Sequence, residues 1–278
     1  MDINLQKWQL KISLIEIDQL KPHEKIIERQ VDEIASEILR ENNVRDPMIV
    51  DDKDYVILDG MHRYNSLKKL GCTLAPCCLV NYDLPQIKVG SWYRFLNIPN
   101  TEPIVKKILG NLDLNYEKSA GIENPDLKHA VVITDDTVFK QKDQTDTVNK
   151  AKQAVKIEKS FIEQGYEVVY EPENTFQERL RNGLSNVVIP VPIFTKAEIR
   201  KIAASKHMLP HKVTRHFIPS RPLRLNIPLP LLHARVEDIR DANKELDLIL
   251  SKRRMNRKPS GSIIDMRRYQ EELLIFEA

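Results

Sequence analysis

Five consecutive residues, Asp59-Gly60-Met61-His62-Arg63, carry the strongest chemical signal in the sequence. An apolar run ends just before them and a helix is predicted to begin with them, so they occupy a strand-to-helix turn. The first turn of a helix has N–H groups outside the helix's own hydrogen bonds and the positive end of its dipole, which favour a bound anion. Gly60 lets the backbone approach a phosphate closely, and Arg63 can donate two hydrogen bonds to phosphate oxygens.

A purely structural interpretation explains the same residues. Arg63 would then pair with Asp59 and stabilise the start of the helix. In the functional interpretation, Asp59 could hold a divalent cation or orient a hydroxyl group. Because short motifs also arise by chance, the residues alone leave both interpretations open.

The neighbouring hydrophobic patterns predict a compact α/β unit around this turn. We expect strands at 13–17, 47–50, 55–58 and 76–80, and helices at 31–40 and 61–70. A polar turn at 51–54 separates two of the apolar runs and predicts a hairpin. Gly71 is a typical residue to end the second helix.

The rest of the chain reads as a second, mixed α/β region. We expect strands at 129–134, 166–170 and 187–191, and helices at 104–109, 148–164 and 236–254, with a further helix capped by Thr195. We therefore predict an α/β (α+β) fold with two domains, residues 1–95 and residues 96–278.

Composition argues against nucleic acid as a partner. The chain has 278 residues, 41% hydrophobic and 30% charged, and its 43 basic and 40 acidic residues give a net charge of +3. A dedicated nucleic-acid binder has a concentrated basic face. The one basic run, residues 252–258, is interpreted as a solvated helix end and loop.

The cysteines and the apolar runs predict a cytoplasmic protein without a membrane partner. Cys72, Cys77 and Cys78 form neither a disulfide framework nor the paired spacing of a zinc site. The first ten residues contain no apolar signal segment, and no run approaches the ~20 apolar residues of a membrane span. We predict no metal site built by the protein alone.

Residues 55–70 resemble the strand–Asp-Gly-x-His-Arg–helix box of the ParB/sulfiredoxin superfamily. The upstream turn Lys21-Pro22-His23-Glu24 and the run at 46–50 fit the same pattern, so the resemblance covers roughly residues 12–82. It implies a ParB/sulfiredoxin-like nucleotide-binding domain within residues 1–95, with residues 96–278 completing the substrate site.

Among the branches of this superfamily, the chain most resembles the free L-serine kinases. Sulfiredoxins carry a catalytic Cys directly before His-Arg, where this chain has Met61. ParB proteins follow the box with helix-turn-helix elements, whereas residues 81–125 are interrupted by prolines. The turn at 20–24 and the late segments 213–216 and 225–229 resemble those of the kinases.

The resemblance assigns catalytic roles to Glu24, as the base, and to Asp59. It places the nucleotide phosphates on Gly60, Met61, His62 and Arg63. The structural alternative for Glu24 is a solvated side chain in a turn, which is the commoner fate of a single Glu.

The resemblance also assigns substrate-binding roles to Trp92, Thr214, Arg215 and His216. Trp92 would line the serine pocket, and the other three would suit a carboxylate or a phosphate. The structural alternatives are an ordinary core aromatic for Trp92 and a surface ion pair for Arg215.

The resemblance implies phosphate transfer from ATP or ADP to the hydroxyl of L-serine, giving O-phospho-L-serine. Mg²⁺ is expected with the nucleotide, because polyphosphate oxygens need charge neutralisation. The sequence leaves open the donor, a homodimer, and whether the product supplies cysteine or siderophore synthesis. Two other functions remain open: a ParB-like DNA-binding regulator and a nucleotide-hydrolysing switch.

Overall fold

The computed structural model describes residues 1–5, 8–120, 130–134, 136–142, 145–205 and 207–277. The chain forms two compact units and passes between them more than once. The first unit comprises Met1–Lys88, Lys196–Met208 and His216–Ala278, and the second comprises Val89–Thr195 and Leu209–Arg215. The overall class is mixed α/β, as predicted.

A five-stranded sheet forms the centre of the first unit. Its strand order is β1 (Asp2–Leu5), β2 (Trp8–Glu16), β6 (Leu74–Val80), β4 (Met48–Asp51) and β5 (Ile57–Asp59). β4 runs parallel to β6, and the other neighbours are antiparallel. The predicted strands at 13–17, 47–50, 55–58 and 76–80 are confirmed in β2, β4, β5 and β6, because their apolar residues fill this core.

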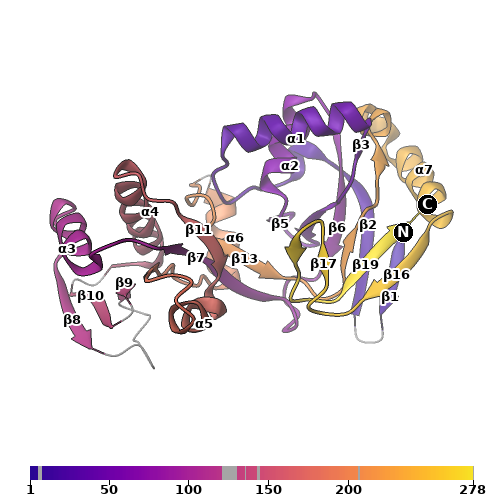
Figure 1. Ribbon diagram of the computed structural model, residues 1–278. Helices are drawn as coiled ribbons and strands as arrows, with labels where there is room; N and C mark the ends of the chain where they lie inside the picture. The colour runs from indigo at the N-terminus through magenta and orange to yellow at the C-terminus, as the bar shows by residue number, and fades with distance from the viewer. Residues whose placement is uncertain (6–7, 121–129, 135, 143–144, 206, 278) are drawn as a thin grey trace. The chain divides into compact units, whose positions relative to one another are not determined.

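Helices α1 (Glu28–Glu41) and α2 (Met61–Lys69) lie side by side in the first unit (Figure 1). Both helices were predicted. Val31 of α1 and Leu67 of α2 are buried, and the Ser66 hydroxyl donates to the Val31 carbonyl at 2.9 Å. Asn42, in the left-handed conformation, ends α1. The short strand β3 (Asn43–Val44) follows, and it pairs with β15 (Ile227–Pro228).

The C-terminal part of the chain returns to the first unit. It contributes α6 (Lys196–Ser205), β14 (Arg221–Leu223), α7 (Ile239–Ser251), β16 (Arg254–Lys258), β17 (Ile263–Ile264), β18 (Arg267–Arg268) and β19 (Leu273–Glu277). β19 pairs in parallel with β14 and antiparallel with β16. The prediction of a loop within residues 252–258 was wrong, because residues 254–258 form strand β16, which pairs with β19.

The second unit is built on a larger sheet. Its strand order is β11 (Val169–Pro172), β7 (Lys88–Leu96), β12 (Val187–Ile189), β9 (Ala130–Thr134), β10 (Thr137–Gln141) and β8 (Tyr116–Ala120), and β13 (Thr214–Phe217) also pairs with β7. Helices α3 (Thr101–Asn111), α4 (Thr147–Glu163) and α5 (Phe176–Arg181) accompany it. The long strand β7 was not predicted.

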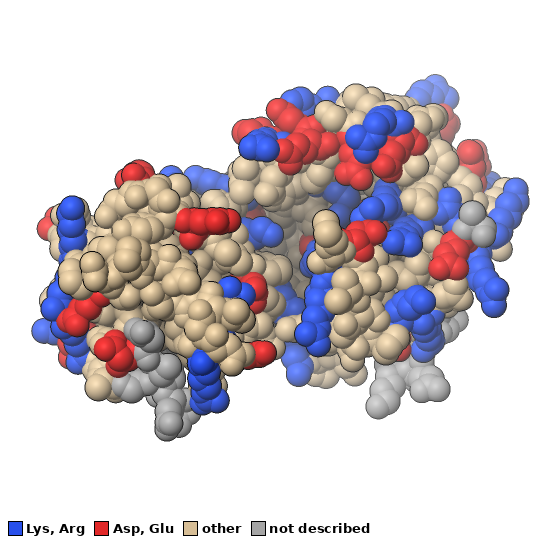
Figure 2. Space-filling model, viewed as in Figure 1, with Lys and Arg blue, Asp and Glu red and all other residues tan. Residues whose placement is uncertain are grey.

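Charges on the face shown in Figure 2 are mixed, with Lys and Arg side chains interspersed among Asp and Glu. Among the helices that the structure describes, none combines the length and hydropathy needed to cross a bilayer.

Candidate functional site

The predicted strand-to-helix turn forms at the junction of β5 and α2. Gly60 caps the N-terminus of α2 with φ +103°, a conformation that L side chains rarely adopt. A Cβ on Gly60 would lie 2.8 Å from Met48 Cγ and 3.0 Å from Arg63 Nη2. Both the backbone conformation and the crowding therefore require glycine where the turn closes against Arg63.

Asp59 lies between two guanidinium groups. Its Oδ2 accepts hydrogen bonds from Arg63 Nη2 at 3.3 Å and from Arg221 Nη1 at 3.1 Å. Burial alone would raise the pKa of Asp59, but Arg221, Arg63 and Arg267 together hold it well below its usual range. Asp59 is therefore ionised at neutral pH. The Arg63–Asp59 pair of the structural interpretation is present, and a second, unpredicted arginine accompanies it.

Arg221 anchors this turn from the C-terminal part of the chain. It is almost completely buried, and its Nε donates to Glu271 Oε1 at 2.8 Å while its Nη2 donates to the His216 carbonyl at 3.1 Å. Glu271 is buried as well. Arg221 and Glu271 were not predicted from the sequence, because no local pattern links two residues that are 50 positions apart.

A cavity of about 120 Å³ adjoins Arg63. Arg63 Nη2 also donates to the Pro47 carbonyl at 3.0 Å, while its buried Nε has no partner among the described residues. A buried donor of this kind is costly unless water or a ligand pairs with it. The lining combines apolar and charged side chains: Ile34, Glu37, Ile38, Glu41, Asn43, Val44, Arg45, Asp46 and Arg63.

Glu24 lies in a segment that hydrogen bonds fix at both ends. Upstream, the Lys21 N–H donates to the Tyr55 carbonyl at 2.9 Å. Downstream, the Ile27 N–H donates to His62 Nε2 at 3.1 Å. Glu24, the predicted base, is buried, with 8% of its surface exposed. It is therefore not the solvated side chain of the structural alternative. The hydrogen bond to His62 ties this segment to the first turn of α2.

His216 and His23 form a buried imidazole pair. Their ring centroids lie 5.9 Å apart in an edge-to-face arrangement, and the Tyr82 hydroxyl is 2.7 Å from His216 Nε2. Burial, together with the neighbouring His23, lowers the pKa of His216 to about 3, and burial lowers that of His23 to about 4. Both rings are neutral near pH 7. His216 is therefore a hydrogen-bonding group and not a cation there.

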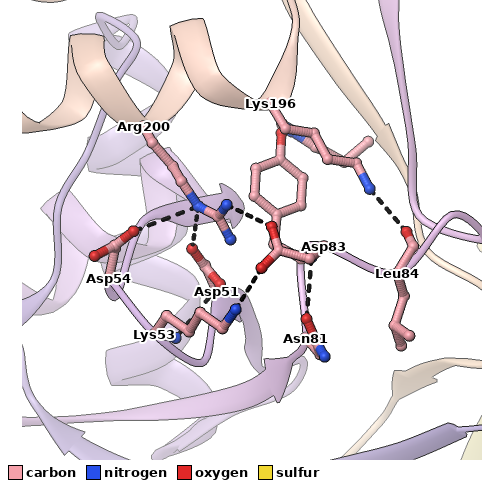
Figure 3. A network of polar contacts seen from close by, with 10 residues as sticks. Asp51, Lys53, Asp54, Asn81, Asp83, Leu84, Lys196 and Arg200 are labelled. Atoms are coloured by element: carbon pink, nitrogen blue, oxygen red, sulfur yellow. Dashed lines mark hydrogen bonds and ion pairs between the residues drawn. The ribbon is translucent and has the colours of Figure 1, made fainter.

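Tyr82 links this pair to the polar network of Figure 3. Arg200 of α6 donates from Nε to Asp51 at 2.8 Å and from Nη1 to Asp83 at 2.6 Å. The guanidinium of Arg200 also lies 5.2 Å from the centre of the Tyr82 ring. Asp51 is completely buried, so a fixed ion pair holds α6 against the sheet of the first unit.

In the second unit, Trp92 of β7 is half-buried and carries two cations near its ring. Lys212 Nζ lies 4.8 Å and the Arg215 guanidinium 5.8 Å from the ring centre. Thr214, between them in the chain, is buried. The structure thus brings together Trp92, Thr214 and Arg215, all predicted for the substrate, and Trp92 is not an enclosed core aromatic.

The predicted residues form two groups. Glu24, residues 59–63 and His216 belong to the first unit, whereas Trp92, Thr214 and Arg215 belong to the second. Among the described residues, no cluster of three or more His, Cys, Asp or Glu side chains is arranged to hold a metal ion.

Known L-serine kinases are similar to this chain in sequence. No family model matches the chain. The chain is 28% identical over 238 residues to the ATP-dependent L-serine kinase of Staphylothermus marinus, covering 79% of this chain and 90% of that protein. It is 23% identical over 220 residues to the ADP-dependent L-serine kinase SerK of Thermococcus kodakarensis, covering 77% and 90%. A ParB-like protein of Sulfolobus acidocaldarius is 42% identical over 78 residues, covering 28% and 39%.

Among solved structures, a free serine kinase in complex with AMP matches with a TM-score of 0.66 and 22% identity, covering 80% of this chain and 93% of that one. The fold is therefore that of the free serine kinase structures. The chain is related to the archaeal L-serine kinases and to a ParB-like protein. The resemblance read from the sequence is confirmed.

Proposed function

We propose that this protein transfers a phosphoryl group from ATP or ADP to the hydroxyl of free L-serine and releases O-phospho-L-serine. One observation carries the proposal: the chain matches an ATP-dependent and an ADP-dependent L-serine kinase over 90% of the length of each. The buried Glu24 supports it, since its segment is tied through His62 to a helix start where Arg63 and Arg221 pair with Asp59. Phosphoryl transfer needs a positioned base and fixed positive charge.

The nucleotide phosphates bind at the start of α2, in a ParB/sulfiredoxin-like domain that we assign to residues 1–95. The backbone at Gly60, Met61 and His62 offers N–H groups, and Arg63 adds a guanidinium whose buried Nε has no partner among the described residues. His62 also fixes the segment that carries the base, since it accepts the Ile27 N–H. Glycine at position 60 lets the turn keep its positive φ where Met48 and Arg63 leave no space for a Cβ.

Glu24 is the proton acceptor, and Asp59 is not. A carboxylate whose pKa is held far below its usual range is a weak base, and Asp59 is in that state. Asp59 instead orients Arg63 and Arg221, whose positive charge stabilises the negative charge on the transferring group. Glu24 takes the proton from the serine hydroxyl as that oxygen attacks the terminal phosphorus atom of the nucleotide. The bond from this phosphorus to the bridging oxygen breaks, and ADP leaves when ATP is the donor, or AMP when ADP is the donor.

The acceptor amino acid binds through residues of the later region, 96–278, together with Trp92. Trp92, Thr214 and Arg215 lie close together in the second unit, and Arg215 is suited to the serine carboxylate. His216, neutral at physiological pH, contributes a hydrogen-bonding ring.

Mg²⁺ fits this site as an ion that arrives with the nucleotide. Mg²⁺ keeps several waters and needs only one or two protein carboxylates when phosphates supply the other ligands. Asp59 and Glu24 are the carboxylates of the proposed site, and no larger acidic cluster occurs among the described residues. When bound, the ion would neutralise charge on the phosphate oxygens.

The test is product formation. Purified protein is incubated with L-serine, Mg²⁺ and either ADP or ATP, and O-phosphoserine is measured by mass spectrometry. We expect O-phosphoserine with at least one donor. Nucleotide hydrolysis that is independent of serine would instead support the nucleotide switch. No reaction, with DNA binding that persists at physiological salt, would support the ParB-like regulator.

A further inference from the structure

Arg94, in the middle of β7, is completely buried. Arginine is almost never enclosed in this way unless its charge is paired and its N–H groups have acceptors. The charge is paired by Glu158 of α4, which is also buried: Arg94 Nε donates to Glu158 Oε2 at 2.8 Å.

The other hydrogen bonds of Arg94 go to main-chain carbonyls. Nη1 donates to the carbonyls of Trp92 at 2.8 Å and Lys212 at 2.7 Å, and Nη2 donates to the carbonyl of His211 at 3.2 Å. Two of these acceptors lie more than 110 positions further along the chain. One planar guanidinium therefore joins strand β7 to the segment that begins at residue 211.

That segment carries the residues assigned to the substrate. Thr214 and Arg215 follow His211 and Lys212 directly, and Lys212 and Arg215 both lie near the Trp92 ring. A hydrogen bond that involves a charged group is stronger than one between neutral groups. The bonds from Arg94 therefore connect Trp92 with residues 211 and 212, in addition to the pairing of β13 with β7.

Glu158 is itself held in place. The Tyr170 hydroxyl donates to its Oε1, and His211 Nε2 lies 3.9 Å from the same oxygen. The guanidinium of Arg94 also lies 5.4 Å from the centre of the Tyr170 ring. Arg94 is thereby constrained on one side by Glu158 and on another by an aromatic ring.

We propose that Arg94 is a positioning residue for the acceptor amino acid, holding residues 211–215 against Trp92 so that the serine site keeps its shape. The proposal rests on the serine kinase function proposed above. All of the contacts that carry it lie within the second unit, whereas the phosphate-binding turn belongs to the first. Loss of Arg94 therefore weakens serine binding without an equal effect on the nucleotide.

The experiment compares Arg94→Lys with the wild-type enzyme and a matched control. Lysine keeps the charge but cannot donate to Glu158 and to three carbonyls in one plane. We expect the KM for serine to rise by about tenfold or more, because small displacements of a binding group cost large factors. The KM for the nucleotide should stay within about twofold.

Arg179→Lys is the matched control. Arg179 is also in the second unit, lies 5.0 Å from the Phe95 ring and pairs with Glu171. Its other hydrogen bonds among the described residues go to Ser185 and Leu184 and not to residues 211–215. We expect its serine KM to be unchanged. Tyr170→Phe, which removes only the hydroxyl that holds Glu158, should give a smaller rise in serine KM than Arg94→Lys.

A second measurement does not depend on activity. Trp8 and Trp92 are the two tryptophans of the chain. In a Trp8→Phe background, acrylamide quenching reports on Trp92 alone. Increased quenching in Arg94→Lys, with an unchanged circular dichroism spectrum, would support the proposal. Unchanged quenching would overturn the proposal. Equal increases in the KM for serine and the KM for the nucleotide, together with a loss of secondary structure, would also overturn it. A wild-type enzyme without kinase activity would contradict the proposed function, while the quenching result would still test the position of Trp92.

Discussion

Arg221 in the first unit and Arg94 in the second are both enclosed arginines, but they use their donors differently. Arg221 joins two carboxylates, Asp59 and Glu271, and reaches one main-chain carbonyl. Arg94 pairs with one carboxylate and reaches three carbonyls. The first arrangement fixes charge beside the proposed phosphate site. The second fixes backbone beside the proposed serine site.

This difference fits the two ligands that the proposed function requires. A polyphosphate is recognised through charge, so its site needs guanidinium groups that are held in place, here by a carboxylate that stays ionised at neutral pH. A small amino acid is recognised through shape and a few hydrogen bonds, so its site needs a segment held at a fixed distance from Trp92.

The largest expected loss of stability comes from Arg221→Met. Removing one partner of a buried ion pair leaves an uncompensated charge and costs about 3–5 kcal/mol. Here Glu271 and Asp59 would both lose a partner. Urea unfolding measures the loss. Arg224→Met is the control, because its partner Asp265 is exposed and the pair is worth at most about 1 kcal/mol. Similar losses in both variants would contradict the special role of Arg221.

The pH dependence of stability should reveal the buried histidines. The pKa of His23 is lowered to about 4 and that of His216 to about 3, so both rings take up protons mainly after unfolding. Their contribution is therefore complete above the unfolded pKa of about 6.5 and is lost as the pH falls below it. Each ring lowers the unfolding free energy by up to about 1.4 kcal/mol per pH unit.

Urea unfolding at several pH values between 7 and 4.5 measures this slope. His216→Gln should flatten it, whereas the same change at the exposed His207 should leave it as in the wild type. The contribution of Asp59 to stability changes in a separate, more acidic pH range. Its lowered pKa stabilises the fold above the unfolded value of about 3.9, and this contribution is lost as the pH falls below that value. If the unfolding free energy of His216→Gln depends on pH as steeply as that of the wild type, His216 is not a neutral, buried imidazole.

Gly60→Ala should damage the phosphate turn. The new Cβ meets Met48 Cγ at 2.8 Å in a backbone conformation with φ +103°. Strain of about 1–3 kcal/mol would weaken ADP binding by about 5- to 150-fold if the turn shifts to relieve it. Isothermal titration calorimetry with ADP measures the effect. Gly71→Ala is the matched control, since Gly71 also has positive φ (+72°) but no atom crowds the new Cβ. Equal ADP affinity in both variants would argue against phosphate binding at this turn.

Tyr82→Phe should have the smallest effect, about 1 kcal/mol, because it removes one hydrogen bond to His216. A double-mutant cycle with His216→Gln isolates that bond. Additive losses in the cycle would mean that the tyrosine and the histidine are not coupled.

The parts of the structure that depend on local sequence were predictable. The turn at Asp59-Gly60 follows from an apolar strand, a glycine and a helical run, and α1 follows from apolar residues at helical spacing. The resemblance of residues 55–70 to a known nucleotide-binding box gave the family. These signals need only neighbouring residues.

Contacts between distant residues were not predictable. β7 was missed because its pattern includes Arg94, a charged residue that makes sense in a core only beside Glu158, 64 positions away. The return of residues 216–278 to the first unit depends on β14 pairing with β19 and on the Arg221–Glu271 ion pair. His216 was predicted from its motif, but its neutral state follows from burial, which a motif does not reveal.

The most direct test of the central claim is the rate of O-phosphoserine formation by Glu24→Gln compared with Glu28→Gln. Glu28 is an exposed glutamate four positions later, at the start of α1. We predict that Glu24→Gln lowers the rate by about 10²- to 10⁴-fold, the usual contribution of a general base, and that Glu28→Gln leaves it unchanged. A folded Glu24→Gln protein that makes O-phosphoserine at the wild-type rate would contradict the assignment of Glu24 as the base.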